Sequence, residues 1–493
     1  MSREGIVFHL EGRGDVVLSH FSGKRILLLQ GPMGPFFWRL KKDLEAVGAR
    51  VDKVNFCAGD QLFYPRDAIP FRGSFDQWPD FLSGLLTRQR YDAVMLFGDC
   101  RPYHRVVPHL IRFMKTRLYV FEEGYLRPDH ITLERDGVNS FSSLPRDPEV
   151  YRRFPDHSVE QAVKQHTRHA FAWSATFAVS FALWNFFLAW RFPRYRHHRS
   201  LNPFKEAFYW CRGAARKLHF SRLEAPSEQQ ILAPDAPPFF LVPLQTHNDA
   251  QITVHSDFES IEEFIGVVLR SFVESAPAGH RLVFKHHPLD RGYTDYTRLI
   301  KRLAQDQGVA DRVFYVHDLH LPKLLDHARG TVVINSTVGL SSILHGTPVC
   351  VLGDPVYHMP GLTHQGALNG FWKEPGQVDK KLFQRFRAWL LAHNQANGNF
   401  YERLDNLPGH TGVIWPPCWE WIRCPSPPKK PPPRWTPACS AGQPPARWYW
   451  GKWPSRHPIA RCNRSHPAGS RLAPRARYLS VGLAGCCALL HNL

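Results

Sequence analysis

Short apolar runs alternate along the chain with stretches whose apolar residues recur at helical spacing. The first apolar run, residues 25–30, ends at Gly31 and Pro32, and residues 36–47 follow with helical spacing. The alternation continues with predicted strands at 51–56, 92–98 and 118–121 and predicted helices at 78–88 and 106–114. Strands that alternate with helices predict a mostly parallel sheet covered on both faces.

A second series of the same kind occupies the later part of the chain. Its predicted strands are residues 239–244, 281–285, 312–316, 331–334 and 349–352, and its predicted helices are 257–273, 296–304 and 338–344. The pattern therefore predicts an α/β fold of two Rossmann-like lobes, residues 20–150 and 237–400, with ligands at the carboxyl ends of the strands.

Between the two series, residues 170–190 form an uncharged apolar stretch rich in aromatic side chains, and the basic run 191–199 follows it. Its length would just span a bilayer. An apolar helix can equally be buried in a large protein or lie on a membrane surface. Those two alternatives are favoured over a span by the polar residues Ser174, Thr176, Ser180 and Asn185. We expect residues 160–230 to be a helical insert that faces membrane or lipid.

The positive charge of the chain is concentrated in its last segment. Of the formal net charge of +19, residues 411–493 supply +11, from twelve Lys or Arg against Glu420. The remaining +8 favours anionic partners such as a nucleotide, a lipid phosphate or a membrane surface. The same segment holds fifteen prolines, seven tryptophans and six of the ten cysteines. Such a composition predicts a disordered tail or a translated frameshift.

The body of the chain has features of a cytosolic protein. Its four cysteines, Cys57, Cys100, Cys211 and Cys350, are scattered without a pattern, which suits a reducing compartment. The first residues contain early acids and lack an apolar core followed by a cleavage site, so no signal peptide is predicted.

Candidate site residues in the first lobe follow two predicted strands. Gln30, Gly31 and Pro32 open a helix, where they form either a tight turn or a cleft contact to a sugar or phosphate. Glu122 and Glu123 end the strand near residue 118. Because adjacent side chains on a strand point in opposite directions, one of the two faces the cleft as acid or base. The other is expected to pair with Arg127 or a neighbour.

In the second lobe, the loop after the first strand contains Gln245, Asp249 and Gln251. Asp249 is either a catalytic carboxylate or the cap of the next helix. The next strand ends in Lys285, His287 and Pro288, where an ammonium and an imidazole could meet phosphate. His286 and His287 point apart and lack metal-ligand spacing, so no metal is predicted.

A hydroxyl motif, Asn335, Ser336 and Thr337, follows the predicted strand 331–334 and precedes a helix. It offers hydroxyl and N–H groups to an anion, or it is an ordinary N-cap.

Taken together and in order, six segments resemble the capsule polysaccharide synthesis family, most closely its protein S branch from bacteria with lipid-anchored group 2 type capsules. The resemblance covers about residues 20–400 and rests on LLLQGPMGPFF, FEEGYLRPDHITLE, RFPRYRHHR, VPLQTHNDAQI, FKHHPLD and VINSTVGLSSILHGTPV. It implies a glycosyltransferase-B type fold. The implied activity is that of a retaining β-Kdo transferase, which moves Kdo from CMP-Kdo to a phosphatidylglycerol-type lipid acceptor.

The resemblance also implies a cytoplasmic protein, peripheral at the inner face of the cytoplasmic membrane, beside capsule assembly and export proteins. No cofactor is implied, since CMP-Kdo is the donor substrate. By resemblance, His287 and Pro288 contact the CMP phosphate and ribose, with Ser336 and Thr337 as the companion motif and Lys285 and Asn335 in support. The related enzymes point to Asp249 as nucleophile and to Glu122 or Glu123 as acid/base.

Two other functions compete with glycosyl transfer. A non-catalytic export factor would bind polymer or lipid and would have no need of the cleft carboxylate Asp249. A nucleic-acid binder is suggested by the pI of 9.6 and the Trp- and Arg-rich tail. The body motifs fit no nucleic-acid module, so no nucleic-acid partner is expected.

Overall fold

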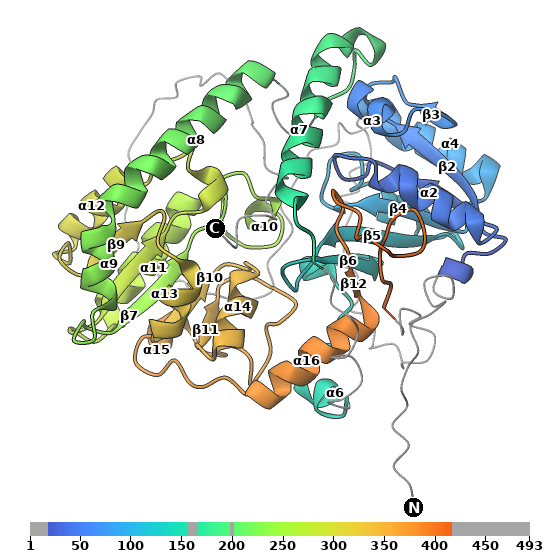
Figure 1. The fold of residues 1–493 in the computed structure, drawn as a ribbon. Coiled ribbons are helices and arrows are strands. Elements are labelled where there is room, and N and C mark those ends of the chain that lie inside the picture. The colour runs from blue at the N-terminus through green and yellow to red at the C-terminus, as the bar shows by residue number, and fades with distance from the viewer. Residues whose placement is uncertain (1–17, 155–165, 198–201, 417–493) are drawn as a thin grey trace, which may run out of the picture.

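The protein folds into two α/β lobes that lie side by side (Figure 1). The computed structural model describes residues 18–154, 166–197 and 202–416. The N-terminal lobe, blue to teal in Figure 1, contains a seven-stranded sheet, and the C-terminal lobe, green to yellow, contains a five-stranded sheet. The α/β fold with two lobes that the alternating pattern predicts is confirmed.

Five parallel strands build the centre of the N-terminal sheet, in the order β5-β4-β1-β2-β3, and antiparallel β6 and β12 extend it beyond β5. The strands are β1 (Arg25–Leu28), β2 (Arg50–Asn55), β3 (Ala68–Pro70), β4 (Ala93–Phe97), β5 (Arg117–Glu123), β6 (His130–Arg135) and β12 (Gln395–Asn397). The connecting helices are α2 (Phe36–Ala46), α3 (Ala58–Phe63), α4 (Trp78–Gln89) and α5 (Val107–Ile111).

All five strands of the C-terminal sheet are parallel, in the order β11-β10-β7-β8-β9. They are β7 (Phe239–Pro243), β8 (Arg281–Lys285), β9 (Val313–Val316), β10 (Gly330–Val333) and β11 (Val349–Val351). The helices of this lobe are α10 (Ala250–Thr253), α11 (Ile261–Ser275), α12 (Thr297–Asp306), α13 (Leu321–His327), α14 (Val338–His345) and α15 (Leu368–Phe371).

Several strands are apolar along their whole length because helices cover both faces of each sheet. Ile26 and Leu28 join one buried cluster of the N-terminal lobe, whereas Leu27 belongs to the cluster on the opposite face. Alternate side chains of a strand point to opposite faces, so a strand buried on both sides needs apolar residues throughout. This arrangement leaves the polar groups at the carboxyl ends of the strands, where loops begin.

The chain returns from the C-terminal lobe to the N-terminal lobe through α16 (Lys380–His393), the orange helix at the bottom of Figure 1. This helix packs on α6 (Pro148–Arg152), with the rings of Tyr151 and Phe386 centred 4.9 Å apart. The next strand, β12, pairs with β6 in the N-terminal sheet. The predicted C-terminal lobe, residues 237–400, is therefore wrong at its end, because β12 belongs to the other lobe.

The predicted tail also begins too early. Thr411 donates a 2.6 Å hydrogen bond from its hydroxyl to Asp43, and the backbone of Ile414 pairs with Asn397. Trp415 is buried in the N-terminal core beside Phe121. Residues 411–416 thus belong to the lobe, because their side chains find partners that composition alone cannot reveal. The rest of the predicted tail, and the start of the chain where a signal peptide was excluded, lie outside the described residues.

The helices between the lobes do not form one insert. One face of α7 (Ala170–Phe187) packs on α3, where Asn185 Oδ1 accepts the Gly59 N–H at 3.0 Å. In contrast, α8 (Pro203–Leu223) and α9 (Ala225–Leu232) lie on the C-terminal lobe, where Arg212 Nε donates to the Gly292 carbonyl at 2.6 Å. Each half of the predicted unit 160–230 therefore belongs to a different lobe.

Candidate functional site: the facing edges of two sheets

Glu122, at the end of β5, is buried, and its Oε1 accepts the Glu123 N–H at 3.0 Å. Glu123 is engaged elsewhere: Arg127 lies 3.7 Å from its Oε2 and the Tyr401 hydroxyl donates to its Oε1 at 3.2 Å. Burial raises the pKa of Glu122 to about 7, and the nearby charges of Glu123 and Asp99 act in the same direction. The sequence predicted that one of the two glutamates would pair with Arg127, and the structure identifies it as Glu123.

The turn after β1 is built into the lobe. Gln30 is buried, and its amide donates to Asp60 Oδ1 at 3.1 Å and to the Tyr195 hydroxyl at 3.0 Å. A Cβ at Gly31 would lie 2.8 Å from the ring of Phe37, so this position accepts only glycine without rearrangement. Pro32 is buried as well. The tight turn is therefore observed, and Gly31 and Pro32 also line a small pocket with Trp38 and Lys53, so a ligand contact at this turn stays a prediction.

In the C-terminal lobe, the loop after β7 is tied to the end of β10. Gln245 Nε2 donates to Asn335 Oδ1 at 3.1 Å and to Asp249 Oδ2 at 3.3 Å. Asn335 Nδ2 in turn donates to the carbonyl of Gln251 at 2.7 Å. The N–H of Gln251 donates to Asp249 Oδ1 at 2.9 Å, so Asp249 also makes the turn contact expected of a cap. The structure brings all four predicted residues into one network.

The end of β8 is more buried than the sequence suggested. Lys285 is buried and its Nζ donates to the carbonyl of His317 at 3.3 Å. Burial, followed by the charge of Arg291, lowers the pKa of Lys285 to about 8. His286 points into the lobe and bonds to the Tyr315 hydroxyl. The two adjacent histidines therefore diverge, as their position at a strand end predicts.

His287 and Pro288 begin the short helix η4 (Pro288–Asp290), with His287 Nδ1 accepting the Leu289 N–H at 3.2 Å. Ser336 Oγ accepts the N–H of Val338 at 3.2 Å at the start of α14. His287 thus caps η4, whereas the N-cap residue of α14, Thr337, makes no cap hydrogen bond through its side chain. Ser336 and Thr337 remain only partly buried at that helix start, where hydroxyl and N–H groups suit an anion.

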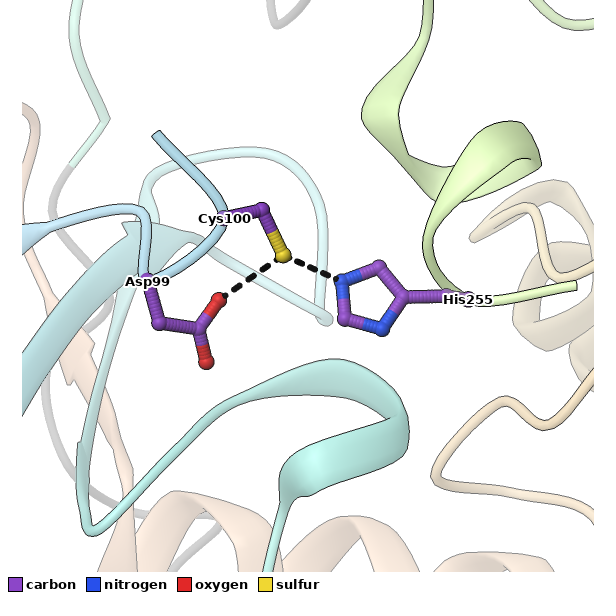
Figure 2. Close-up of side chains that lie close together, drawn as sticks. All are labelled: Asp99, Cys100 and His255. Carbon is purple, nitrogen blue, oxygen red and sulfur yellow. Dashed lines mark hydrogen bonds between the residues drawn. The ribbon is translucent and has the colours of Figure 1, made fainter. Parts of the chain in front are cut away.

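A cluster that joins the two lobes was not predicted. Figure 2 shows Asp99 and Cys100, which follow β4 in the N-terminal lobe, facing His255 of the C-terminal lobe. Cys100 Sγ lies 3.0 Å from His255 Nε2 and 3.2 Å from Asp99 Oδ1. Burial raises the pKa of the Cys100 thiol and of the Asp99 carboxyl, and lowers the pKa of His255 to about 3. Carboxylate, thiolate and imidazole are also the ligand types that bind transition metals.

His255 links this cluster to the network of the C-terminal lobe. Its carbonyl accepts Asn335 Nδ2 at 3.2 Å, and its Nδ1 bonds to the hydroxyl of Ser140. The available signal in the sequence was the position of Asp99 and Cys100 directly after a strand, where loops often carry function. Their partner could not be found by spacing, because His255 lies 155 positions after Cys100.

The two edges therefore differ in chemistry and are joined at His255, which contacts Cys100 and Ser140 of the N-terminal lobe. The N-terminal edge presents a carboxyl group, Glu122, whose pKa near 7 lets it take or give a proton at neutral pH. The C-terminal edge presents amide, hydroxyl and N–H groups around Asn335 and Ser336, together with the carboxylate of Asp249. Such an arrangement suits group transfer between a ligand held by one lobe and a ligand held by the other.

A family model and two relatives of about 40% identity point to one family. The capsule polysaccharide biosynthesis protein family matches residues 92–401. The capsule polysaccharide export protein KpsS of Escherichia coli is 39% identical over 394 residues, which cover 79% of this chain and all of KpsS. The capsule polysaccharide modification protein LipB of Neisseria meningitidis serogroup A is 41% identical over 389 residues, covering 78% of this chain and 93% of LipB.

Among solved structures, a β-Kdo 2,7 transferase, KpsC of Thermosulfurimonas dismutans, aligns with 78% of this chain and 94% of its own, at 14% identity and a TM-score of 0.37. The family match covers more than half of the present sequence, and the relatives align over nearly their whole length. On these grounds the chain belongs to the capsule polysaccharide biosynthesis protein family.

Proposed function

We propose that this protein is a retaining glycosyltransferase that transfers Kdo from CMP-Kdo to a phosphatidylglycerol-type lipid at the inner face of the cytoplasmic membrane. Membership of a capsule biosynthesis family supports a role in making or exporting capsular polysaccharide. The choice of donor and acceptor rests on the resemblance of the sequence motifs. An anionic donor and an anionic acceptor also suit a body with an excess of basic residues.

One observation carries the proposal of catalysis rather than binding alone. A continuous chain of contacts runs from Cys100, at the N-terminal edge, through His255 and Asn335 to Gln245 and Asp249. The loop that holds Asp249 is thus fastened to the edge from which Glu122 projects. Two carboxyl groups in different environments, one with a pKa near 7, are the usual equipment of retaining sugar transfer.

In the proposed mechanism, the carboxylate of Asp249 attacks the anomeric carbon of Kdo and CMP leaves with the bonding electron pair. The acceptor hydroxyl then displaces Asp249 from the same carbon, which restores the original configuration. Glu122 accepts the hydroxyl proton in this second step. A carboxylate whose pKa is near 7 is a stronger base than an ordinary glutamate, yet it is still largely ionised slightly above neutrality.

The C-terminal edge is the proposed donor site. Ser336 and Thr337 at the start of α14, with His287 on the neighbouring loop, would contact the CMP phosphate and ribose. Lys285 and Asn335 would hold these loops in position, since both are buried and hydrogen-bonded within the lobe. Hydroxyl groups, helix N–H groups and a nearby ammonium can balance phosphate charge, so the transfer step as proposed requires no metal.

The outer surfaces of α7 and α8 are proposed to rest on the membrane. Among the described residues, α7 has the length and composition of a membrane-crossing helix. Its polar Asn185 and one whole face are nevertheless packed on the N-terminal lobe, which favours a surface position. The far end of α7 meets the start of α8, where the rings of Phe186 and Phe204 are 5.9 Å apart.

Around that junction, four aromatic side chains project into solvent: Phe187 (68% exposed), Trp190 (72%), Phe204 (72%) and Phe208 (59%). Exposed basic residues lie near them in the sequence: Arg194, Arg196 and Lys205. Aromatic side chains flanked by basic ones are typical of proteins that dock on anionic lipid surfaces. A transferase whose acceptor is a phospholipid would need such a surface, and capsule assembly and export proteins would be its neighbours there.

A direct test is to incubate the purified full-length protein with CMP-Kdo and a fluorescent lysophosphatidylglycerol and to identify products by mass spectrometry. We expect the acceptor to gain the mass of Kdo. A single addition would indicate initiation of a chain, and a ladder would indicate polymerisation. Lipid binding without any sugar addition would contradict the proposal and favour an export factor that binds lipid or polymer.

A further inference from the structure

The cluster between the lobes has the composition and arrangement of a metal site. Asp99, Cys100 and His255 each offer one ligand atom, and these three atoms lie within 4.8 Å of one another. Asp99 and His255 are buried and Cys100 is partly buried. Ligands around one zinc ion, at about 2.0–2.3 Å from the metal, lie at similar mutual distances.

The outward-facing atoms of the ligand side chains are already held by other groups. His255 directs Nε2 to the cluster, while its Nδ1 bonds to the hydroxyl of Ser140. Asp99 directs Oδ1 to Cys100, while its Oδ2 accepts the N–H of Val138 at 3.1 Å. Metal-binding histidines and carboxylates are usually oriented in this way, with the second polar atom fixed by an outer partner. This outer shell is an indication of a metal site separate from the ligand types themselves.

We propose that Asp99, Cys100 and His255 bind a single Zn²⁺ ion that fastens the two lobes together. A thiolate, an imidazole and a carboxylate form a ligand set that suits zinc, whereas magnesium and calcium prefer oxygen ligands alone. Binding converts the Cys100 thiol to a thiolate and releases its proton to solvent. The two negative charges of the thiolate and the Asp99 carboxylate then balance the two positive charges of the ion, so the buried site is neutral overall.

An ion bound at this position would join the two lobes. Cys100 and His255 belong to different lobes and lie 155 positions apart in the chain, so one ion would close a very long loop. His255 also accepts a hydrogen bond from Asn335 through its carbonyl. The ion would therefore fix both the separation of the lobes and the loop that carries Asp249. Such a link between the lobes can be measured without any substrate of the proposed transfer reaction.

The first test uses the unaltered full-length protein. The protein is stripped with a chelator, divided, and treated with an alkylating reagent with or without added Zn²⁺, and labelled cysteines are located by peptide mass spectrometry. We expect Zn²⁺ to slow the labelling of Cys100 at least tenfold and to leave Cys211, an exposed thiol on α8, unchanged. Equal labelling of Cys100 in both samples would overturn the proposal.

A second test counts bound metal by elemental mass spectrometry after reconstitution with Zn²⁺. Cys100→Ser and His255→Ala should each bind one equivalent less than the unaltered protein. The matched controls, Cys211→Ser and His219→Ala, remove an exposed thiol and an exposed imidazole from α8 and should lose none. Full metal content in folded Cys100→Ser and His255→Ala proteins would contradict the site. Should either variant fail to fold, the labelling experiment still decides.

Discussion

The two lobes have the same architecture but carry different chemistry at their facing edges. The N-terminal edge holds a buried carboxyl group at Glu122, whereas the C-terminal edge gathers amides, hydroxyl groups and helix N–H groups around Asn335 and Ser336. Each lobe also carries one of the two exposed aromatic helices, α7 on the first and α8 on the second. A repeated fold can therefore carry different chemistry at each edge, and in the proposed reaction one edge supplies the base and the other the anion site.

The largest effect is expected from Asp249, the one carboxylate on the C-terminal edge to which we assign covalent chemistry. Asp249→Ala should lower the rate of transfer by about 10³-fold or more, because no nucleophile would remain to displace CMP. Asp257→Ala, which removes an exposed acid shortly after it, is the control and should leave the rate unchanged. The measurement is product formation by mass spectrometry. An active Asp249→Ala protein would remove the assigned nucleophile.

Glu122→Gln should reduce transfer by about 10²–10⁴-fold, because the acceptor hydroxyl would lose its base. In the unaltered protein the rate should rise with pH and level off above about 7, as Glu122 loses its proton. Glu123→Gln, beside it but paired with Arg127, should cost far less. A pH profile that is the same in Glu122→Gln would show that another group is titrating.

Glu122→Gln should also stabilise the folded protein. The pKa of Glu122 is raised in the folded state from 4.5 to about 7, so the folded protein binds the proton more tightly than the unfolded chain. Stability is therefore lost as pH rises from about 4.5 through 7. At pH 8, Glu122→Gln should increase the free energy of unfolding by about 1–3 kcal/mol, measured by urea denaturation. No gain at pH 8 would mean that Glu122 is solvated rather than buried.

The aromatic junction of α7 and α8 can be tested on phosphatidylglycerol vesicles. Phe187→Glu combined with Trp190→Glu should weaken sedimentation with such vesicles by about tenfold or more, because two exposed apolar side chains become charged. Phe113→Glu alters an aromatic residue that is 91% exposed elsewhere on the N-terminal lobe and is the matched control. An equal loss of sedimentation in the control would mean that vesicle binding does not depend on where the exposed aromatic residue lies.

The close packing of α7 on α3 predicts a smaller effect, on stability. Gly59→Ala would place a Cβ 2.3 Å from the ring of Phe181 and should cost about 1–3 kcal/mol. Gly279 has no atom within 4 Å of the corresponding position, so Gly279→Ala should change stability by less than about 0.5 kcal/mol. Thermal unfolding of the two variants measures the difference. Similar melting temperatures would show that α7 is loosely attached.

Strong apolar periodicity predicted most of the two sheets. The predicted strand at 281–285 is β8 itself, and the helix predicted at 78–88 is α4 within one residue. In contrast, β12 consists of Gln395, Ala396 and Asn397, which have no apolar pattern. It forms because its backbone pairs with β6 across more than 250 residues. Local sequence cannot reveal strands that depend on a distant partner.

The sequence likewise predicted only part of the candidate site. Loops at strand ends pointed to Asp249, Gln245 and Asn335, which the structure brings together. The sequence could not determine which of Glu122 and Glu123 is free, because the answer depends on Arg127 and on Tyr401, 278 positions away. His255 was missed for a similar reason, since its side chain contacts Cys100 and Ser140 of the other lobe.

The division of work between the edges is tested most directly by measuring kcat and the KM for CMP-Kdo in Glu122→Gln and Ser336→Ala. Glu122→Gln should lower kcat and leave the donor KM nearly unchanged. Ser336→Ala should raise the donor KM about five- to tenfold, the loss of roughly one hydrogen bond, with little change in kcat. A Ser336→Ala protein with normal donor KM, or a Glu122→Gln protein defective in donor binding, would contradict the account.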